Sequence, residues 1–231
     1  MANLCIIPAR GGSKRIPKKN IREFLGKPII AYSIEAAFEA GIFDEIMVST
    51  EDKEIADIAQ KFGAKVPFFR SGDNADDYAT TADVIKEVII EYAKDNKEFE
   101  NICCFYPTAP FTSCARLIEG YKKLQLQSVN SVFPIVEFSY PVLRSLKMDD
   151  NGMVSMIWSE HLNSRSQDLS KAYHDAGQWY WIKNNVFLST EKIIGVGAYG
   201  LQLNELEVQD IDNEIDWKLA EIKYEYLQSI K

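Results

Sequence analysis

Short apolar segments alternate with longer helical patterns through the first half of this chain, and this alternation restricts its fold more than any other feature. Four segments that are short and rich in apolar side chains predict buried strands: residues 3–7, 45–49, 65–69 and 102–106. Helical patterns follow them and begin near Pro28, Asp52, Thr80 and Ser113. Strands that alternate with helices favour an α/β fold with a mostly parallel sheet.

The pattern changes in the second half of the chain. Residues 137–175 contain turn signals and short β-like runs but no clear helix, which is typical of a lid or an oligomerisation arm inserted in an α/β core. The core pattern resumes at residues 178–182, a last strand is predicted at 206–208, and an amphipathic helix is predicted at 213–230. We therefore expect one domain, residues 1–231, with an excursion at about 137–175.

Composition excludes several classes of function. The net charge of −8 argues against a general nucleic-acid binder or a membrane-surface binder. The chain has no apolar stretch of transmembrane length and no recognisable signal peptide, so we expect a cytoplasmic protein. The four cysteines lack metal-site spacing, and Cys5, Cys103 and Cys104 lie in strand-like apolar runs, which favours buried free thiols. His161 and His174 are far apart in the sequence, so a histidine-based zinc site is not expected.

A basic loop follows the first predicted strand, where residues 7–20 read IPARGGSKRIPKKN. Its cations precede the first acidic residue of the region, Glu23: Arg10, Lys14, Arg15, Lys18, Lys19 and Arg22. The glycines at 11 and 12 let the backbone approach a ligand closely, and N–H groups beside cations at a strand's carboxyl end suit a polyphosphate. On an acidic protein, this loop is the candidate active site for a small anionic ligand.

The basic loop does not match the two standard phosphate-binding motifs. A P-loop needs two glycines separated by four residues before Lys and Ser or Thr, and the dinucleotide fingerprint needs a third glycine. The alternative interpretation is a solvated basic loop without a ligand. Its position directly after a buried strand argues for the ligand-binding interpretation.

Asp210 and Asp212 stand between the last predicted strand and the last predicted helix. Two carboxylates spaced by one residue on extended chain point the same way, which suits the oxygen-only coordination of Mg²⁺. The alternative is that Asp212 caps the helix, a role that does not require Asp210. A basic loop together with two aspartates that bind Mg²⁺ is typical of enzymes that catalyse phosphoryl and nucleotidyl transfer.

Two further polar segments could contact substrates. Arg70, Thr80 and Thr81 flank a polar stretch that could read a base and a ribose, although threonines also cap helices without a ligand. Residues 163–181 mix polar and aromatic groups in a way that suits a carboxylated, amidated sugar. The candidate sugar-binding residues are Arg165, Gln167, Tyr173, His174, Asp175 and Gln178. For His174 the alternative is a satisfied surface or interface histidine.

Together these motifs resemble the CMP-sialic acid synthetase family, the cytidylyltransferases that activate nonulosonic acids. The resemblance covers nearly the whole chain through the segments IPARGGSKRIPKKN, GKPII, VSTEDKEIA, YPTAPF and DIDNEIDW. Within the family, YHDAGQWYW is most similar to the pseudaminic acid enzymes. Asp175 stands where sialic acid enzymes usually carry asparagine, and Tyr106 where they usually carry glutamine. Arg144 is one residue away from the place of a lysine often used near the sugar, and these differences favour pseudaminic acid.

The resemblance implies a Rossmann-like three-layer α/β/α nucleotidyltransferase core, a Mg²⁺ requirement, and a homodimer in which one subunit's excursion reaches the other's active site. It implies that the sugar's anomeric hydroxyl attacks the α-phosphorus of CTP, giving a CMP-sugar for carbohydrate biosynthesis such as flagellin glycosylation. Asp210 and Asp212 would hold Mg²⁺, and the expected catalytic residues are Arg10, Lys14, Lys19 and Asp212. The expected nucleotide-binding residues are Ala9, Arg10, Gly11, Gly12, Ser13, Lys14, Lys19, Asn20, Arg70, Thr80 and Thr81.

Three alternatives stay open. The same reaction could use N-acetylneuraminic, legionaminic or KDO-type acids. The chain could be a non-catalytic nucleotide-binding protein, although the basic loop together with two aspartates argues for catalysis. A purely structural dimerisation module would leave the basic loop unexplained.

Overall fold

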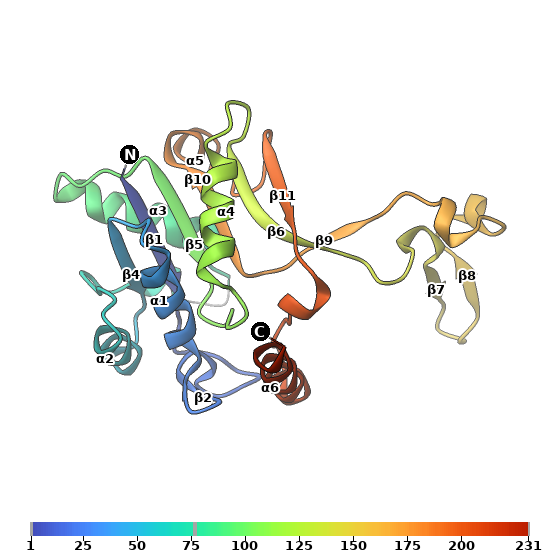
Figure 1. The fold of residues 1–231 in the computed structure, drawn as a ribbon, viewed down its shortest axis with the longest axis horizontal. Coiled ribbons are helices and arrows are strands. Elements are labelled where there is room, and N and C mark those ends of the chain that lie inside the picture. Colours follow the sequence, from blue (N-terminus) through green and yellow to red (C-terminus); the bar gives the residue numbers. More distant parts are fainter. Residues whose placement is uncertain (1, 76–77, 231) are drawn as a thin grey trace.

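A mixed β-sheet forms the centre of the computed structural model, which describes residues 2–75 and 78–230 (Figure 1). The strands lie in the order β11 (Ala198–Gln202), β6 (Ser131–Glu137), β10 (Trp179–Lys183), β5 (Asn101–Phe105), β1 (Asn3–Pro8) and β4 (Glu45–Ser49), and β9 (Tyr173–Asp175) pairs with β6. Five strands run in one direction, whereas β9 and β10 run in the opposite direction. The predicted α/β fold with a mostly parallel sheet is therefore confirmed.

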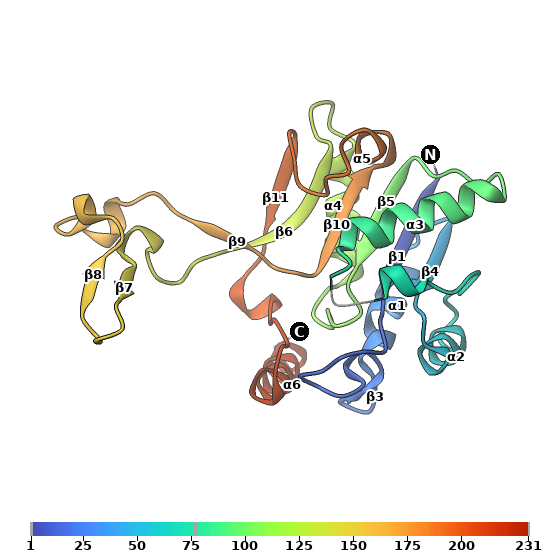
Figure 2. The same cartoon turned by 180° about the vertical axis from the view of Figure 1, so that it is seen from behind.

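Helices cover both faces of this sheet (Figures 1 and 2). One face carries α1 (Ile29–Ala40), α2 (Lys53–Lys61) and α4 (Cys114–Leu124), and the other carries α3 (Thr81–Lys94) and α5 (Asn184–Thr190). The alternation of side chains along β10 explains the two layers of core. Trp179 and Trp181 belong to the core with α1 and α4, while Tyr180 and Ile182 belong to the core with α3 and α5.

Helix boundaries follow the capping signals in the sequence. Thr80 caps α3, because its hydroxyl accepts the Asp83 N–H while the Asp83 carboxylate accepts the Thr80 N–H. Asp52 caps α2 by accepting two N–H groups of the first turn. Gly41 ends α1 in the left-handed region, with φ 62°. The predicted boundaries of α1 and α2 and the predicted start of α3 are thus confirmed.

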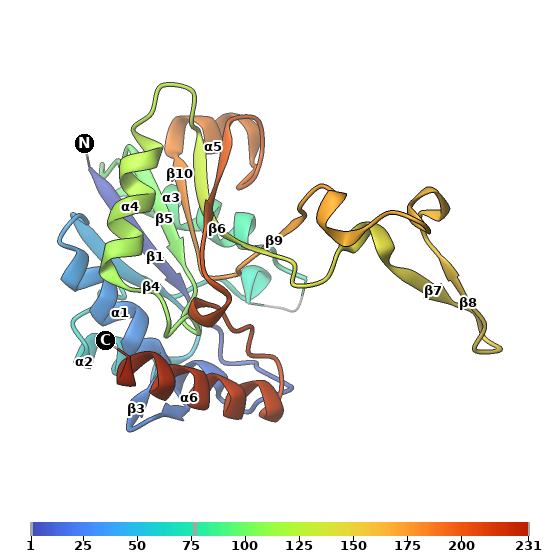
Figure 3. The ribbon, with the colours of Figure 1, turned by 45° about the vertical axis from the view of Figure 1, so that its right-hand side comes forward.

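The C-terminal helix α6 (Glu214–Ser229) packs beside the N-terminal part of the chain (Figure 3). Trp217 lies edge-to-face with Phe24 of the hairpin formed by β2 (Glu23–Phe24) and β3 (Lys27–Pro28), with ring centroids 5.6 Å apart. The Arg22 guanidinium covers the Trp217 ring at 4.5 Å from its centroid and pairs with Glu214. These contacts place the segment before α6 beside the basic loop.

Residues 138–172, here called the arm, leave the core between β6 and β9 (Figures 1 and 3). Within the arm, β7 (Leu146–Met148) and β8 (Val154–Met156) form a small hairpin. Its helical turns are short 3-10 segments at Val142–Arg144, Ser159–His161 and Ser166–Asp168. The arm exposes large apolar side chains: Phe138, Tyr140, Leu146, Met148, Met153, Val154, Ile157 and Leu162. An apolar surface of this kind is typical of a protein–protein contact.

Two predicted strands are wrong. Residues 65–69 run beside β4 but form a single bridge, between Met47 and Lys65, because Pro67 has no N–H with which to extend the ladder. Residues 206–208 overlap a 3-10 helix, Glu205–Glu207, which begins with a capping box at Asn204. The sequence analysis missed the edge strand β11 and the short helix α5.

The four cysteines are free thiols that are buried or half-buried. Cys5, Cys103 and Cys104 are buried and free, as predicted, and Cys114 is free and half-buried. Burial raises the pKa of the Cys104 thiol, so it stays protonated at neutral pH.

Within residues 2–75 and 78–230, no helix has the length and apolar character needed to span a membrane.

Candidate active site

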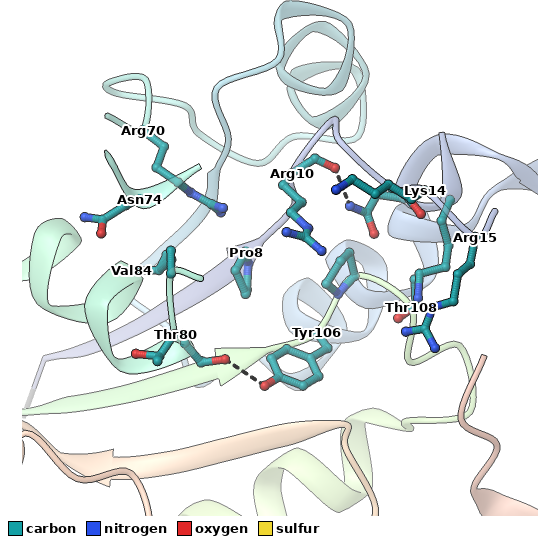
Figure 4. Close-up of a pocket in the computed structure, with 16 residues that line it drawn as sticks. Pro8, Arg10, Lys14, Arg15, Arg70, Asn74, Thr80, Val84, Tyr106 and Thr108 are labelled. Atoms are coloured by element: carbon teal, nitrogen blue, oxygen red, sulfur yellow. Dashed lines mark hydrogen bonds between the residues drawn. The ribbon is translucent and has the colours of Figure 1, made fainter. Parts of the chain in front are cut away.

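The basic loop leaves β1 at Pro8 and is held from two directions. The Asn20 side chain donates to the Arg10 carbonyl at 2.8 Å (Figure 4). The Gly11 N–H donates to the Glu51 carboxylate at 2.7 Å. A Cβ on Gly11 would lie 2.5 Å from Asp52 Oδ2, so only glycine lets the loop approach the start of α2 this closely. Contacts with Asn20, Glu51 and Asp52 therefore fix the position of the basic loop.

Three of the residues expected to bind the nucleotide, Ala9, Gly11 and Asn20, make contacts within the chain. The Gly11 N–H is occupied by Glu51 Oε1, while Glu51 Oε2 is buried without a hydrogen-bond partner in the described part of the chain. The Ala9 side chain is fully buried in the core and lines neither of the two cavities described below. Asn20 lines the nucleotide-sized cavity, but its amide nitrogen is engaged with the loop backbone. A Cβ on Gly12 would meet nothing within 4 Å.

A cavity of about 700 Å³ lies between the basic loop, the start of α3 and the end of β5 (Figure 4). Eight of the eleven predicted nucleotide-binding residues line it: Arg10, Ser13, Lys14, Lys19, Asn20, Arg70, Thr80 and Thr81. Among the other lining residues, the sequence analysis did not assign four with polar side chains to the nucleotide: Arg15, Asn74, Tyr106 and Thr108. Arginine and lysine side chains are concentrated here on an acidic protein, which suits a polyphosphate.

Arg70 supplies a buried positive charge to this cavity. Its guanidinium donates to the Ser49 hydroxyl at 3.0 Å and to the Ser49 carbonyl, which holds the side chain in one orientation. Burial lowers the pKa of Arg70, and the nearby Glu51 carboxylate opposes that effect. An arginine nevertheless remains protonated at neutral pH. Arg70 and Arg10 point into the cavity from opposite sides (Figure 4).

Tyr106 lines this cavity and also a second one. Its hydroxyl hydrogen-bonds with the Thr81 hydroxyl at 2.8 Å (Figure 4). Its ring lies edge-to-face with that of Tyr180, with 5.5 Å between the ring centroids. The Tyr180 hydroxyl donates to the Asp175 carboxylate at 2.7 Å. Burial raises the pKa of both tyrosines, so both hydroxyls stay protonated. Tyrosine side chains therefore form the wall between Thr81 and Asp175.

The second cavity, of about 560 Å³, lies between β9, the end of β5 and the segment before α6. It shares Lys19, Tyr106 and Thr108 with the first cavity, so the two are adjacent. Lys223 of α6 also lines it, donates to the Val208 carbonyl at 2.7 Å, and has a pKa lowered by burial. Cations and acceptors on one wall suit a ligand that carries both a carboxylate and hydroxyl groups.

The predicted sugar-binding residues do not all meet at this cavity. His174 and Asp175 line it, while Tyr173 lies at the exposed start of β9. The His174 Nδ1 lies 2.9 Å from the Asp175 carbonyl oxygen. Arg165 and Gln167 lie in the arm and line neither cavity of their own chain, and Arg165 pairs there with Asp168.

Gln178, which the sequence analysis assigned to the sugar site, does not line the second cavity. The side chain is buried, and its amide nitrogen donates to the Glu207 carbonyl at 2.7 Å. Its amide oxygen accepts from the Thr112 hydroxyl at 3.1 Å. Both polar atoms of Gln178 are therefore satisfied inside the core.

Asp210 and Asp212 flank the buried Ile211 directly before α6. Asp210 lines the second cavity, whereas Asp212 pairs with Arg15 at 2.7 Å and lies 3.8 Å from Lys19 Nζ. Burial lowers the pKa of Lys19, and both aspartates oppose this effect. The C-terminal segment thus reaches the basic loop. Asp212 does not cap α6, because Asn213 accepts the N–H groups of its first turn.

The two aspartates fit a Mg²⁺ ion that is shared with a substrate. Magnesium prefers oxygen ligands and is commonly held by one or two carboxylates, with phosphates and water completing its coordination. Across residues 2–75 and 78–230, no group of three or more His, Cys, Asp or Glu side chains could hold a metal by itself. Asp212 would exchange its contact with Arg15 for the ion.

Comparisons with known proteins agree with this geometry. A family model described as Cytidylyltransferase matches residues 4–194. The chain belongs to the cytidylyltransferase family. The matched region of this cytidylyltransferase includes the basic loop, the whole lining of the first cavity and His174 and Asp175 of the second.

Curated relatives match this cytidylyltransferase over nearly its whole length. It is 44% identical over 224 residues to a pseudaminic acid cytidylyltransferase of Campylobacter jejuni, with 97% of each chain covered. It is 33% identical to a CMP-N,N′-diacetyllegionaminic acid synthase of Legionella pneumophila, with 96% of this chain and 95% of the relative covered. The chain is thus more similar to the first of these two relatives.

A solved structure shares the fold of this cytidylyltransferase. CMP:2-keto-3-deoxy-manno-octonic acid synthetase complexed with CTP superposes with a TM-score of 0.72 over 99% of this chain and 100% of that chain. The two sequences are 16% identical, so the likeness concerns the fold alone. It confirms the expected Rossmann-like α/β/α nucleotidyltransferase core.

Proposed function

We propose that this chain is a pseudaminic acid cytidylyltransferase, which transfers CMP from CTP to pseudaminic acid and releases pyrophosphate. The observation that carries this proposal is a pair of adjacent cavities, one rich in cations, that meet at Lys19, Tyr106 and Thr108. The relative with 44% identity over 97% of both chains supports pseudaminic acid as the sugar.

CTP occupies the cation-rich cavity in this proposal. Arg10, Lys14 and Lys19 neutralise the triphosphate and stabilise the negative charge that develops on the leaving pyrophosphate. Arg70, fixed by Ser49, and Thr81 hold the cytidine at the other end of the cavity. The protein's contribution is to position the reactants and to balance their charge.

Pseudaminic acid occupies the second cavity in this proposal. Lys19 and Lys223 attract the sugar carboxylate, and Asp175 accepts hydrogen bonds from the sugar. Tyr180 and the Gly177 N–H hold the Asp175 carboxylate in place, at 2.7 Å and 2.8 Å. The anomeric hydroxyl then faces the shared boundary, attacks the α-phosphorus in line, and displaces pyrophosphate by cleavage of the α–β phosphoanhydride bond.

Asp210 and Asp212 would hold Mg²⁺ with the triphosphate. When bound, Mg²⁺ neutralises phosphate charge and makes the sugar hydroxyl a better nucleophile. Lys19 keeps Asp212 beside the basic loop, because it donates to the Ile211 carbonyl at 2.8 Å. Because Lys19 lines both cavities, this contact holds the segment that carries the two carboxylates near their boundary.

The arm serves in this proposal as the contact of a homodimer. Its exposed apolar side chains would be buried against the second subunit. Arg165 and Gln167 would then reach the sugar cavity of the partner subunit, since they line neither cavity of their own chain. The enzyme would act in the cytoplasm, where CTP is available, and its product would supply glycosylation such as that of flagellin.

Pyrophosphate release from CTP and Mg²⁺ tests the reaction and the sugar together. Purified protein would be compared with pseudaminic, N-acetylneuraminic and legionaminic acids, and release with pseudaminic acid alone is expected. Lys19→Ala should abolish release. Lys18→Ala is the matched control, because Lys18 pairs with Glu54 and lines neither cavity.

The other outcomes separate the alternatives. Release with legionaminic acid alone would keep the reaction and replace the sugar, in line with the relative at 33% identity. Release with N-acetylneuraminic acid alone would favour a sialic acid enzyme. Binding of CTP without release for any sugar would favour a non-catalytic nucleotide-binding protein.

A further inference from the structure

The outward face of α6 carries a line of exposed apolar side chains, here called the α6 stripe: Ile215, Leu219, Ile222 and Tyr226. They recur at intervals of four, three and four residues, and each is between 49% and 71% exposed. The opposite face of the helix buries Trp217 and Ala220 against the hairpin of β2 and β3. Figure 3 shows α6 at the outer edge of the molecule, so the stripe is accessible.

The spacing of the α6 stripe is the spacing that pairs two helices in a coiled coil. Ile215 and Ile222 occupy one type of core position, and Leu219 and Tyr226 occupy the other. In an antiparallel pair of α6 helices, Leu219 faces the partner's Ile222 and Ile215 faces the partner's Tyr226. Each contact then occurs twice around a two-fold axis, so the stripe is complementary to itself.

Charges beside the stripe select the antiparallel direction. Lys218 and Glu225 lie seven residues apart on the same edge of the stripe, and both are exposed. In the antiparallel pair each Lys218 faces the partner's Glu225, whereas in a parallel pair it would lie beside the partner's Lys223. Within residues 2–75 and 78–230 neither Lys218 nor Glu225 forms a direct ion pair, although the charge of Lys218 acts on Glu214 one turn away. Both side chains are exposed, so they can reach a partner helix.

The residues on the other edge of the stripe, Asp216 and Lys223, already form hydrogen bonds within the chain. Asp216 accepts the N–H groups of Asp212 and Asn213, and Lys223 donates to the Val208 carbonyl. In the antiparallel arrangement these two positions would also bring opposite charges near each other. They do not oppose the pairing, but Lys218 and Glu225 are the residues that decide its direction.

We propose that the α6 stripe is a docking surface for a second copy of this chain, with the two α6 helices antiparallel across a two-fold axis. This surface is separate from the arm, which leaves the core after Glu137. A chain that also pairs through its arm therefore assembles into a tetramer with two kinds of interface. Because α6 has 16 residues, its pairing alone is weak, and the contact forms at high protein concentration or within that larger assembly.

Charge exchange tests both the contact and its direction. Lys218→Glu or Glu225→Lys alone places like charges across the antiparallel pair, whereas the double exchange restores opposite charges. Sedimentation velocity at high protein concentration should show that either single exchange lowers the assembly mass to about half of the wild-type value, and that the double exchange restores it. Lys122→Glu, an exposed position on α4, makes the same charge change as Lys218→Glu and should leave the mass unchanged.

A second variant separates the contact from a general charge effect. Leu219→Gln removes an apolar side chain from the centre of the stripe without adding charge, and it should also halve the mass while the circular dichroism spectrum stays that of wild type. Equal masses for wild type, both single exchanges and Leu219→Gln would overturn the proposal. A loss in the single exchanges that the double exchange does not repair would overturn it too, because another segment, such as the second copy's arm, would then cover the stripe.

Discussion

Gly11 shows at the scale of one residue how the basic loop is fitted to its neighbours. A Cβ at this position would lie 2.5 Å from Asp52 Oδ2, and the other oxygen of Asp52 caps α2. Gly11→Ala should therefore displace the loop, lower the melting temperature and reduce kcat/KM for CTP by roughly tenfold, equivalent to about 1.4 kcal/mol. Thermal unfolding and steady-state kinetics with varied CTP measure both effects.

Gly12→Ala is the control for this prediction, because the added Cβ would meet no atom within 4 Å. Its melting temperature should stay near the wild-type value. Equal destabilisation by both alanines would show that the close approach of Gly11 to Asp52 is not the cause, because alanine at an open position with a compatible backbone does not destabilise.

At the scale of elements, the start of α6 holds the backbone of the candidate metal ligands. Asn213 accepts two N–H groups of the first turn, and Asp216 accepts the N–H of Asp212. Asn213→Ala should therefore lower the free energy of unfolding by about 1 kcal/mol. It should also lower kcat, because Asp212 loses part of its support. Urea unfolding followed by circular dichroism, with kinetics on the same preparation, measures both.

Ser113→Ala provides the comparison for the α6 cap. Ser113 occupies the equivalent position before α4 but makes no side-chain cap hydrogen bond. Its replacement should change the free energy of unfolding by less than the Asn213 replacement does. If the two variants lost the same stability, the capping box of α6 would not be the cause.

At the scale of the whole molecule, the arm decides whether one chain completes its own sugar site. Arg165 lies in the arm, while Asp212 lies beside the basic loop of the core. If Arg165 acts in the partner subunit, co-expression of inactive Asp212→Asn and Arg165→Ala chains should restore about a quarter of wild-type pyrophosphate release. Half of the dimers are then mixed, and each mixed dimer has one intact site.

A pair of defects in the same part of the molecule is the control for this complementation. Asp212→Asn combined with Lys19→Ala should recover no activity, because both changes affect the core of each subunit. Activity of the first mixture that stays at the mean of its two single variants would contradict a shared site.

The sequence by itself determined the elements whose signals are local. Apolar runs, the capping residues Asp52 and Thr80, and Gly41 act over a few neighbouring residues, so β1, α1, α2 and the start of α3 were predicted where they occur. The basic loop was predictable for the same reason, because its cations are contiguous. The edge strand β11 was missed because its exposed residues and Gly200 weaken the strand pattern.

Only the tertiary structure decided which distant residues meet. Glu51 occupies the Gly11 N–H, Tyr180 joins Tyr106 to Asp175, and Arg15 pairs with Asp212 across 197 positions of sequence. Gln178 turned into the core although it stands between cavity residues and a buried strand. The direction of a side chain depends on how strands and helices pack together. A local sequence pattern therefore cannot show which residues from distant parts of the chain that side chain will contact.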